Sequence, residues 1–346
     1  MKNTYRAVVW KGNGNLEIIE KPILKPVNDK VLIKVKAAGI CGTDLHILSG
    51  KHPQAKPPLI LGHEFAGVVV DVGKDVDQNL IGTRVGIDSY IGCNECMFCR
   101  SSKMQLCENG TTELGINIDG GWSEYVTVPE RNLYIVPKNV DFLEVGAGCI
   151  LNCPLAAIEA VGINPGDTVI IIGDGPSSLV MLQLARLRGA KKVIVTGHRE
   201  KRLKLALELG ADYAINTDIV NISDVIGPTP KENRPQVVID AVGKSETFNF
   251  ALSLAGKYGK VHLFGLSEQP LNNINMDIML WKELKITSST GRPDLWDMSM
   301  DLLSRGFLKI TSLISHRFPF EEAPKAIEFI KSNPGEIIKA IFEMND

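Results

Sequence analysis

Side chains able to bind a metal or move a proton gather in three short segments of the chain. Residues 39–46 read Gly-Ile-Cys-Gly-Thr-Asp-Leu-His, residues 62–64 read Gly-His-Glu, and a second thiol lies at Cys153, before Pro-Leu. Thiolate, imidazole and carboxylate ligands together suit a borderline-soft divalent metal. Three protein ligands would leave one coordination position for water or substrate. These segments therefore raise the hypothesis of an open metal centre.

A second metal site is indicated by cysteines with the spacing C-x2-C-x2-C-x7-C, namely Cys93, Cys96, Cys99 and Cys107. A tetrahedral zinc site would use all of these thiolates and would hold a loop that has little core of its own. Such a site has no open position, so its zinc would be structural. Unpaired cysteines, disulfides and an iron–sulfur cluster are the alternative interpretations.

A glycine turn further along the chain favours nucleotide binding. It follows the apolar run Ile170–Ile172, opens a helical pattern, and consists of Gly173, Asp174, Gly175, Pro176, Ser177 and Ser178. Tight-turning glycines allow backbone N–H groups at a helix N-terminus to bind a pyrophosphate. Ser178 replaces the third glycine of the usual pattern, and we expect the cradle to be slightly shifted.

The end of the next predicted strand bears on the choice of cofactor. NAD sites place Asp or Glu there to bind the ribose 2′-hydroxyl. This chain has Thr196-Gly197-His198-Arg199, with no acid at that place. Gly197 makes room, while His198 and Arg199 can bind a 2′-phosphate, so the sequence favours NADP over NAD. Alternatively, Arg199 stacks on adenine or faces solvent, which leaves NAD usable.

Two different patterns of elements must position these groups. Between Ala7 and about Val72, short β-branched runs indicate an antiparallel or barrel-like fold. After about Pro154, strands alternate with helices, which predicts an open α/β sheet with right-handed crossovers. From about Arg292 the tail has two helical segments and a final strand, and we expect it to return to the first domain. Residues 221–235 have the composition of a mobile loop.

Composition excludes several classes of partner. The chain has 346 residues, a net charge of -2, and 23% charged and 44% hydrophobic residues. This balance gives no bulk attraction to nucleic acid or to an anionic membrane. The first residues lack the apolar core of a secretory signal, and no apolar run reaches the roughly 18–20 residues that cross a bilayer. A cytoplasmic location is the expectation, and closely spaced cysteines there are typically metal ligands.

Taken in order, these motifs resemble the zinc-containing medium-chain alcohol and polyol dehydrogenases from about Tyr5 to Phe342. The resemblance implies an α/β protein with a GroES-like, β-rich catalytic domain at residues 1–154, including a structural zinc lobe at about 90–110. It implies a Rossmann domain at 155–291, with a doubly wound parallel sheet. Residues 292–346 would complete the catalytic domain.

The same resemblance implies roles for residues at the metal centre. Cys41 and His63 match zinc ligands, and Glu64 matches a carboxylate beside the metal that binds it in some members. The third ligand position falls on Cys153, so we expect Cys153 to complete the set, with Glu64 as the close alternative or fourth partner; Cys149 is interpreted as a packed thiol. Asp44 matches the carboxylate that orients the ligand histidine.

The resemblance also implies a proton path and further cofactor contacts. Thr43 matches a hydroxyl beside the bound alcohol, and His46 matches the histidine that passes the proton to solvent. The alternative interpretation of these two residues is helix capping and a surface imidazole. The residues implied on the nicotinamide side are Val242, Phe264, Gly265 and Leu266, and Lys339 is expected near the pyrophosphate.

The implied activity is reversible oxidation of a secondary alcohol to a ketone, with a polyol or sugar-like substrate. Cys153 instead favours a simple alcohol dehydrogenase, and a threonine-type amino alcohol dehydrogenase has similar motifs. The Cys41 and His63 pair argues against a zinc-free enone or quinone reductase. A non-enzymatic nucleotide-binding protein on the same fold is the remaining alternative. The resemblance also implies a homodimer or homotetramer.

Overall fold

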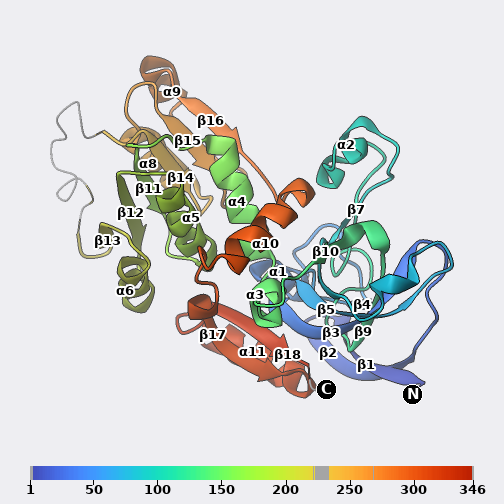
Figure 1. Ribbon diagram of the computed structural model, residues 1–346. Coiled ribbons are helices and arrows are strands. Elements are labelled where there is room, and N and C mark those ends of the chain that lie inside the picture. The colour runs from blue at the N-terminus through green and yellow to red at the C-terminus, as the bar shows by residue number, and fades with distance from the viewer. Residues whose placement is uncertain (1–2, 221, 223–233, 268, 345–346) are drawn as a thin grey trace. The chain divides into compact units, whose positions relative to one another are not determined.

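The computed structural model describes residues 3–220, 222, 234–267 and 269–344 (Figure 1). It divides the chain into two compact units: Met1–Cys149, Arg292–Gly306 and Ile310–Asp346 form the first, and Ile150–Gly291 with Phe307–Lys309 form the second. The boundary therefore lies at the start of helix α4 (Cys149–Val161), a few residues before the expected position. The predicted loop at 221–235 lies mostly outside the described residues.

The first unit is built on a seven-stranded sheet with the order β10-β6-β5-β3-β18-β17, to which β9 is added beside β3. These strands are β3 (Lys30–Ile40), β5 (Phe65–Val72), β6 (Arg84–Ile87), β9 (Tyr125–Pro129), β10 (Leu133–Ile135), β17 (Ile314–Pro319) and β18 (Lys339–Glu343). Their pairing is antiparallel except between β17 and β18. A smaller sheet joins β1 (Thr4–Gly12), β2 (Asn15–Pro22) and β4 (Leu59–Ile60).

The C-terminal segment returns to this unit as predicted from its pattern. Strand β18 pairs antiparallel with β3, with Ile341 opposite Gly39. Helix α11 (Ala323–Ser332) crosses between β17 and β18, and its buried residues recur at the spacing of one helix face. Phe342 of β18 packs edge-on against Trp122, with ring centroids 5.2 Å apart. The last strand is thus part of the core.

The remaining short elements of the first unit carry the candidate metal ligands or connect the strands. The helices are α1 (Gly42–Leu48), α2 (Met97–Arg100), α3 (Phe142–Gly146) and α10 (Trp296–Ser304). Two short strands, β7 (Tyr90–Ile91) and β8 (Thr112–Glu113), pair at the base of the segment that holds α2 (Figure 1). The 3-10 turns are Gln78–Leu80, Met104–Leu106, Glu130–Asn132, Pro293–Leu295, Thr311–Leu313 and Phe320–Glu322.

The second unit is a six-stranded sheet in the order β13-β12-β11-β14-β15-β16, with every neighbouring pair parallel. Its strands are β11 (Thr168–Ile172), β12 (Lys192–Gly197), β13 (Tyr213–Asn216), β14 (Val237–Asp240), β15 (Lys260–Leu263) and β16 (Lys285–Ser288). With α4, the helices are α5 (Pro176–Leu187), α6 (Glu200–Glu208), α8 (Ser245–Leu254) and α9 (Met276–Lys282). The predicted α/β class, with an open parallel sheet, is confirmed.

The strand order of the second unit fixes where a ligand can bind. Strand β11 lies between β12 and β14, so the connections leave it in opposite directions along the sheet. In open α/β sheets a crevice forms outside the carboxyl ends of the strands at such a switch point. The glycine turn follows β11, and the segment Gly197–Arg199 ends β12, so both predicted cofactor segments lie at this edge.

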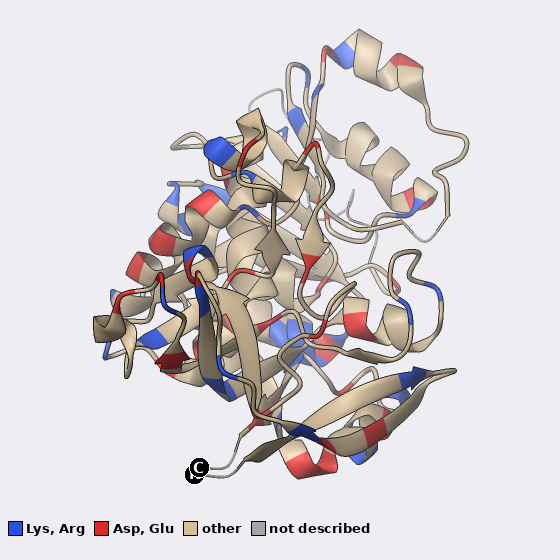
Figure 2. Cartoon of the chain, turned by 90° about the vertical axis from the view of Figure 1, so that its right-hand side faces the viewer, with Lys and Arg blue, Asp and Glu red and all other residues tan. Residues whose placement is uncertain are grey.

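The structure shows where the charged residues lie and how long its apolar helices are. Basic and acidic residues are interspersed along both units (Figure 2). Among the described residues, no helix has the length and apolar character needed to span a membrane.

A candidate metal centre and a candidate nucleotide pocket

Four potential metal ligands converge in the first unit. Cys41, His63, Glu64 and Cys149 each offer one ligand atom, and these atoms lie within 4.8 Å of one another. Cys41 immediately precedes α1, His63 and Glu64 immediately precede β5, and Cys149 begins α4. Two sulfurs, an imidazole nitrogen and a carboxylate oxygen form a donor set that suits zinc. The residues present therefore fit the metal that the sequence predicted.

The second thiol of this group corrects one expectation. The group contains Cys149, which we interpreted as a packed thiol, and it does not contain Cys153, which we expected as a ligand. Both lie on α4, and four residues correspond to about one helical turn. The motif at Cys153 identifies the helix correctly, but the group takes its thiol from the first residue of α4. The hydrogen bond with Cys149 lowers the pKa of Cys41 and outweighs its burial.

Asp44 orients the residues on either side of the group. It is fully buried, and its Oδ2 accepts a hydrogen bond from the backbone N–H of Cys41 at 2.8 Å. Its Oδ1 lies 3.5 Å from Nδ1 of His63, and neither of these two buried atoms has a hydrogen-bond partner among the described residues. The other ring nitrogen, Nε2, lies 3.9 Å from Glu64. His63 thus turns one nitrogen to Asp44 and the other to the ligand group.

Glu64 forms a buried ion pair that the sequence did not predict. Nζ of Lys339 lies 2.6 and 2.8 Å from the two carboxylate oxygens, and both side chains are at most 3% exposed. Lys339, which we expected near the pyrophosphate, thus donates to Glu64, and its contact with the pyrophosphate remains a prediction. Burial raises the pKa of Glu64 to about 7, although the ammonium of Lys339 acts in the opposite direction. A buried carboxylate is costly without such a partner.

Two glycines make room beside the ligands. A Cβ at Gly39 would lie 2.4 Å from Oε2 of Glu64, and a Cβ at Gly62 would lie 2.2 Å from Cδ1 of Trp122. Gly62 also has a φ of +89°, which disfavours other residues. The indole of Trp122 donates to the carbonyl of Gly39 at 3.0 Å. Gly39 and Gly62 are therefore required by close packing around the group.

The residues of the predicted proton path lie on α1. Sγ of Cys41 contacts Oγ1 of Thr43 at 3.8 Å, so the hydroxyl borders the ligand group. His46 follows Thr43 by three residues on the same helix, which gives the two side chains a shared face. The structure thus brings Thr43 to the group and continues the same face to His46.

The four cysteines of the lobe also converge. Cys93, Cys96, Cys99 and Cys107 place their sulfurs within 4.8 Å of one another, and none of the seven cysteines, all of which the structure describes, is in a disulfide bond. Backbone N–H groups of Cys96 and Glu95 donate to Sγ of Cys93 at 3.4 Å. These bonds lower the pKa of Cys93 to about 6. Cys93 therefore favours the thiolate, the form that binds metal, whereas burial raises the pKa of Cys99.

A pocket of about 920 Å³ opens at the ends of β11, β12 and β14 in the second unit. Of the predicted cofactor residues, those that line it are Gly173, Gly175, Gly197, His198, Arg199 and Val242. Gly173 has a φ of +113°, and Gly175 caps α5, with Pro176 at its first turn. Ser177 and Ser178 belong to the same turn, and Ser178 is 1% exposed. The turn thus has the helix-opening geometry that binds phosphate.

The loop after β15 lies beside this pocket without lining it. A Cβ at Gly265 would be 2.3 Å from the carbonyl carbon of Val242, so the loops after β14 and β15 touch backbone to backbone. Phe264 begins this loop, and Leu266 is 85% exposed. Gly265 therefore supports the wall that Val242 forms, and the expected role of Phe264, Gly265 and Leu266 on the nicotinamide side remains a prediction.

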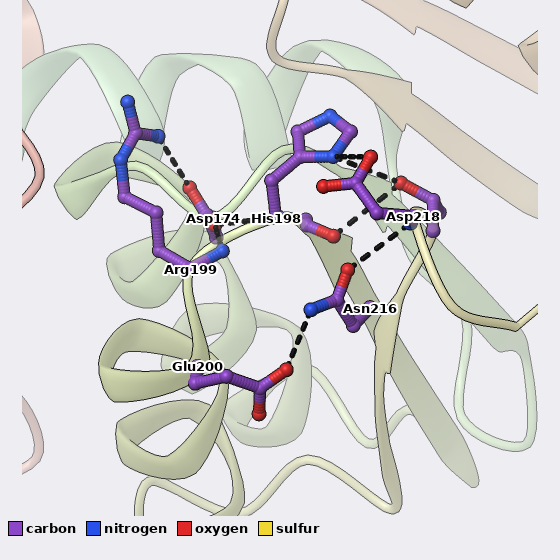
Figure 3. Close-up of polar contacts among 8 residues, drawn as sticks. Asp174, His198, Arg199, Glu200, Asn216 and Asp218 are labelled. Atoms are coloured by element: carbon purple, nitrogen blue, oxygen red, sulfur yellow. Dashed lines mark hydrogen bonds and ion pairs between the residues drawn. The ribbon is translucent and has the colours of Figure 1, made fainter.

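A carboxylate lies at the end of β12, but it comes from the glycine turn after β11 and not from β12 itself (Figure 3). Asp174 of the glycine turn accepts hydrogen bonds from the backbone N–H groups of His198 and Arg199 at 2.9 and 2.8 Å. A Cβ at Gly197 would lie 2.4 Å from Cβ of Asp174. The space left by Gly197 is thus filled by Asp174. The sequence shows an aspartate between two glycines, but it does not show that this aspartate binds the backbone of His198 and Arg199.

Two arginines balance the charge of Asp174. Its Oδ1 lies 3.2 Å from Nη1 of Arg199 and 3.5 Å from Nη1 of Arg202. Burial alone would raise the pKa of Asp174, but the backbone N–H groups and the guanidinium groups together lower it. Arg202 was missed by the sequence reasoning, although it follows Arg199 at helical spacing. Beside them, Nδ1 of His198 lies 2.8 Å from the exposed carboxylate of Asp218.

Comparison with known proteins agrees with these two sites. The model of the alcohol dehydrogenase GroES-like domain matches residues 27–138, and the model of the zinc-binding dehydrogenase family matches residues 178–305. A sorbitol dehydrogenase of Halalkalibacterium halodurans is 34% identical over 334 residues, covering 95% of this chain and 96% of that protein.

Solved structures match the whole chain. One from Escherichia coli CFT073, described as an alcohol dehydrogenase (rspB) in complex with NADH, has a TM-score of 0.92 and 31% identity. Another, a putative zinc-binding dehydrogenase of Sinorhizobium meliloti 1021 bound to NADP, has a TM-score of 0.90 and 35% identity. Each match covers 99% of this chain and 100% of the other. The chain therefore belongs to the zinc-binding alcohol and polyol dehydrogenase family.

Proposed function

We propose that this dehydrogenase oxidises a secondary alcohol of the polyol or sugar-like class, reversibly, and uses NADP in preference to NAD. The observation that carries the proposal is the convergence of the ligand atoms of Cys41, His63, Glu64 and Cys149 within 4.8 Å of one another. The relative named as a sorbitol dehydrogenase supports a polyol substrate. A threonine-type amino alcohol dehydrogenase is the second candidate, because its motifs are similar.

The residues of the group would hold a catalytic zinc. Cys41, His63 and Cys149 supply the ligands, and Glu64 either joins them or stays with Lys339. Bound zinc supplies Lewis acidity toward the alcohol oxygen, and bound nicotinamide accepts the hydride. Asp44 fixes the orientation of the His63 ring from the side of Nδ1. The lobe cysteines would hold a second zinc with no open position, which stabilises that segment.

The chain itself must move the alcohol proton. The hydroxyl of Thr43 borders the ligand group and can accept the proton of the substrate hydroxyl while it passes its own onward. His46, one turn away on α1, then transfers the proton to solvent, because an imidazole exchanges protons near neutral pH.

The preference for NADP rests on the residues at the end of β12. Arg199 lines the pocket with a side chain that is 42% exposed, and a guanidinium binds phosphate well. Residue 197 supplies no carboxylate. Asp174 is 4% exposed and is balanced by two arginines, so a 2′-phosphate meets a basic surface.

The most informative experiment is a substrate panel with both cofactors on the zinc-loaded protein. We expect oxidation of polyols to exceed that of threonine and of simple alcohols, with a higher kcat/KM for NADP than for NAD. Threonine as the best substrate would replace the polyol assignment with the second candidate. Zinc-loaded protein that turns over no alcohol with either cofactor would contradict the proposal as a whole.

A swap of two residues tests the cofactor preference. Gly197→Asp alone should disturb the pocket, since its Cβ would meet Cβ of Asp174 at 2.4 Å. Gly197→Asp combined with Asp174→Gly removes this clash and places the acid where NAD sites have it. We expect the double variant to prefer NAD, as measured by the ratio of kcat/KM for the two cofactors. An unchanged ratio in a folded double variant would contradict the assignment.

We also propose a homodimer or homotetramer. Strand β16 is an edge strand, and beside it the exposed residues of α9 include Met276, Leu280 and Trp281, at 63%, 71% and 77%. Exposed edges and apolar patches of this kind are usually covered by another chain. Sedimentation of the wild type and of Trp281→Glu tests this. We expect the variant to dissociate, and a monomeric wild type would refute the assignment.

A further inference from the structure

The negatively charged carboxylate of Asp174 is bound by a group of hydrogen-bond donors of the kind that bind anions. Two backbone N–H groups, of His198 and Arg199, and two guanidinium groups, of Arg199 and Arg202, surround its carboxylate at 2.8 to 3.5 Å. Figure 3 shows the carboxylate between the glycine turn and the start of α6. All four residues line the 920 Å³ pocket.

The same donors would serve a 2′-phosphate. Arg199 is the N-cap of the nine-residue helix α6, and N–H groups at a helix start favour an anion. Guanidinium groups add charge-assisted hydrogen bonds. Inside this protein, however, the carboxylate of Asp174 already accepts from these groups. A phosphate arriving at the end of β12 must share them with a resident anion.

We propose that Asp174 is a specificity-determining residue that weakens discrimination in favour of NADP, because its carboxylate competes with the 2′-phosphate for the donors of residues 198, 199 and 202. The inference rests on the proposed function in one respect only, namely that this pocket binds the adenosine end of the cofactor. It adds that the enzyme also uses NAD, and that loss of this one charge makes it more selective for NADP.

Removing the charge of Asp174 has two opposite effects on the affinity for a 2′-phosphate. The larger effect decides whether that affinity rises or falls. Without Asp174 the guanidinium of Arg199 is less ordered, which disfavours binding. Against this, one like charge disappears beside the phosphate, and the guanidinium groups of Arg199 and Arg202 are no longer held by an ion pair with residue 174. Arg199 is already 42% exposed, so little order is lost. The electrostatic gain is therefore larger.

Asp174→Asn is the matched substitution, since it keeps the size of the side chain and one oxygen for the backbone N–H groups while it removes the charge. The full-length protein is titrated calorimetrically with 2′,5′-ADP and with 5′-AMP, which differ by the 2′-phosphate. We expect the variant to bind 2′,5′-ADP about tenfold more tightly, the value of one charge-assisted hydrogen bond, with unchanged affinity for 5′-AMP. The ratio of kcat/KM for NADP over NAD should rise to a similar extent.

Asp212→Asn is the control. Asp212 also pairs with an arginine, Arg186, and accepts a backbone N–H at 2.7 Å, yet it does not line the pocket. It should leave the affinity for both nucleotides unchanged. Asp174→Ser provides a second removal of the charge if the asparagine variant does not fold, and retained affinity for 5′-AMP reports a folded pocket.

The outcomes separate this inference from the proposed preference for NADP. If Arg199→Gln loses affinity for 2′,5′-ADP while neither variant of Asp174 gains any, the inference is overturned and the preference stands. If the wild type does not discriminate between the nucleotides but Asp174→Asn prefers 2′,5′-ADP, the preference is overturned and the inference stands. If no variant responds to the 2′-phosphate, both are overturned.

Discussion

The two cysteine-containing groups of the first unit are assembled in opposite ways. The lobe takes all its ligands from residues 93–107, and its own backbone N–H groups donate to the sulfurs. The centre takes Cys41, His63, Glu64 and Cys149 from separate parts of the chain. It also relies on Lys339 of the last strand. A local site is specified by spacing, whereas a dispersed site is specified by the packing of the elements that carry it.

This difference assigns different energetic roles to the two metals. The lobe has only short elements, β7, β8 and α2, so metal binding would supply much of its stability. The centre is held by a core that includes Trp122 and Phe342 and by the pair of Glu64 with Lys339. Its fold should therefore persist without metal, while its activity should not.

The largest expected effect is that of Cys41→Ser. Serine remains a good helix N-cap, so the fold should survive, while the centre loses a thiolate ligand. We expect kcat/KM to fall by about 10³-fold or more, because Lewis acidity supplies several kcal/mol of transition-state stabilisation. Metal analysis should show zinc retained in the lobe alone. Full activity in this variant would remove the basis of the metal assignment.

Cys149→Ser and Cys153→Ser form a matched pair on α4. We expect Cys149→Ser to reduce kcat/KM by at least roughly 10²-fold through loss of zinc, since its sulfur belongs to the ligand group. Cys153→Ser should have a much smaller effect. Kinetics with zinc content measured on both proteins decides between them. The reverse ranking would restore the ligand expected from the sequence.

Asp44→Asn should have an intermediate effect. The amide still accepts the backbone N–H of Cys41 but no longer offers a charged partner to Nδ1 of His63. Substitution of such a supporting residue typically reduces metal affinity or activity by about 10- to 100-fold. Zinc affinity measured by competition with a chelator is the test. Unchanged affinity would show that packing alone orients His63.

The smallest effect on turnover is expected for Cys96→Ser in the lobe. Loss of one of four closed-site ligands should release the structural zinc and lower the unfolding temperature by roughly 5–10 °C. Activity measured well below that temperature should stay close to that of the wild type. An immediate loss of turnover at low temperature, without unfolding, would show that the lobe and the centre are not separable.

The sequence predicted those features of the structure that depend on residues close together in the chain. The spacing of Cys93 to Cys107, the glycine turn after β11 and the alternation of strands and helices all depend on local chemistry, and each corresponds to a feature of the structure. The return of the C-terminal segment to the first unit was also anticipated, although β17 and its parallel pairing were not.

What the sequence could not determine depends on contacts between distant residues. One turn of α4 separates Cys149 from Cys153, and the sequence around them does not reveal which of the two thiols joins the group. Lys339 reaches Glu64 because β18 pairs with β3, which no local pattern reveals. Asp174 bonds to residues more than twenty positions away because Gly197 leaves space for it.

The position of Lys339 also sets an order of events during synthesis. The four thiols of the lobe leave the ribosome as one short stretch, so they can capture metal while the rest of the chain is still being made. Glu64 lacks its counter-ion, Lys339, until β18 has been synthesised and has paired with β3. Nascent chains halted before residue 339 would then hold all four lobe cysteines, while the carboxylate of Glu64 still lacks its counter-ion.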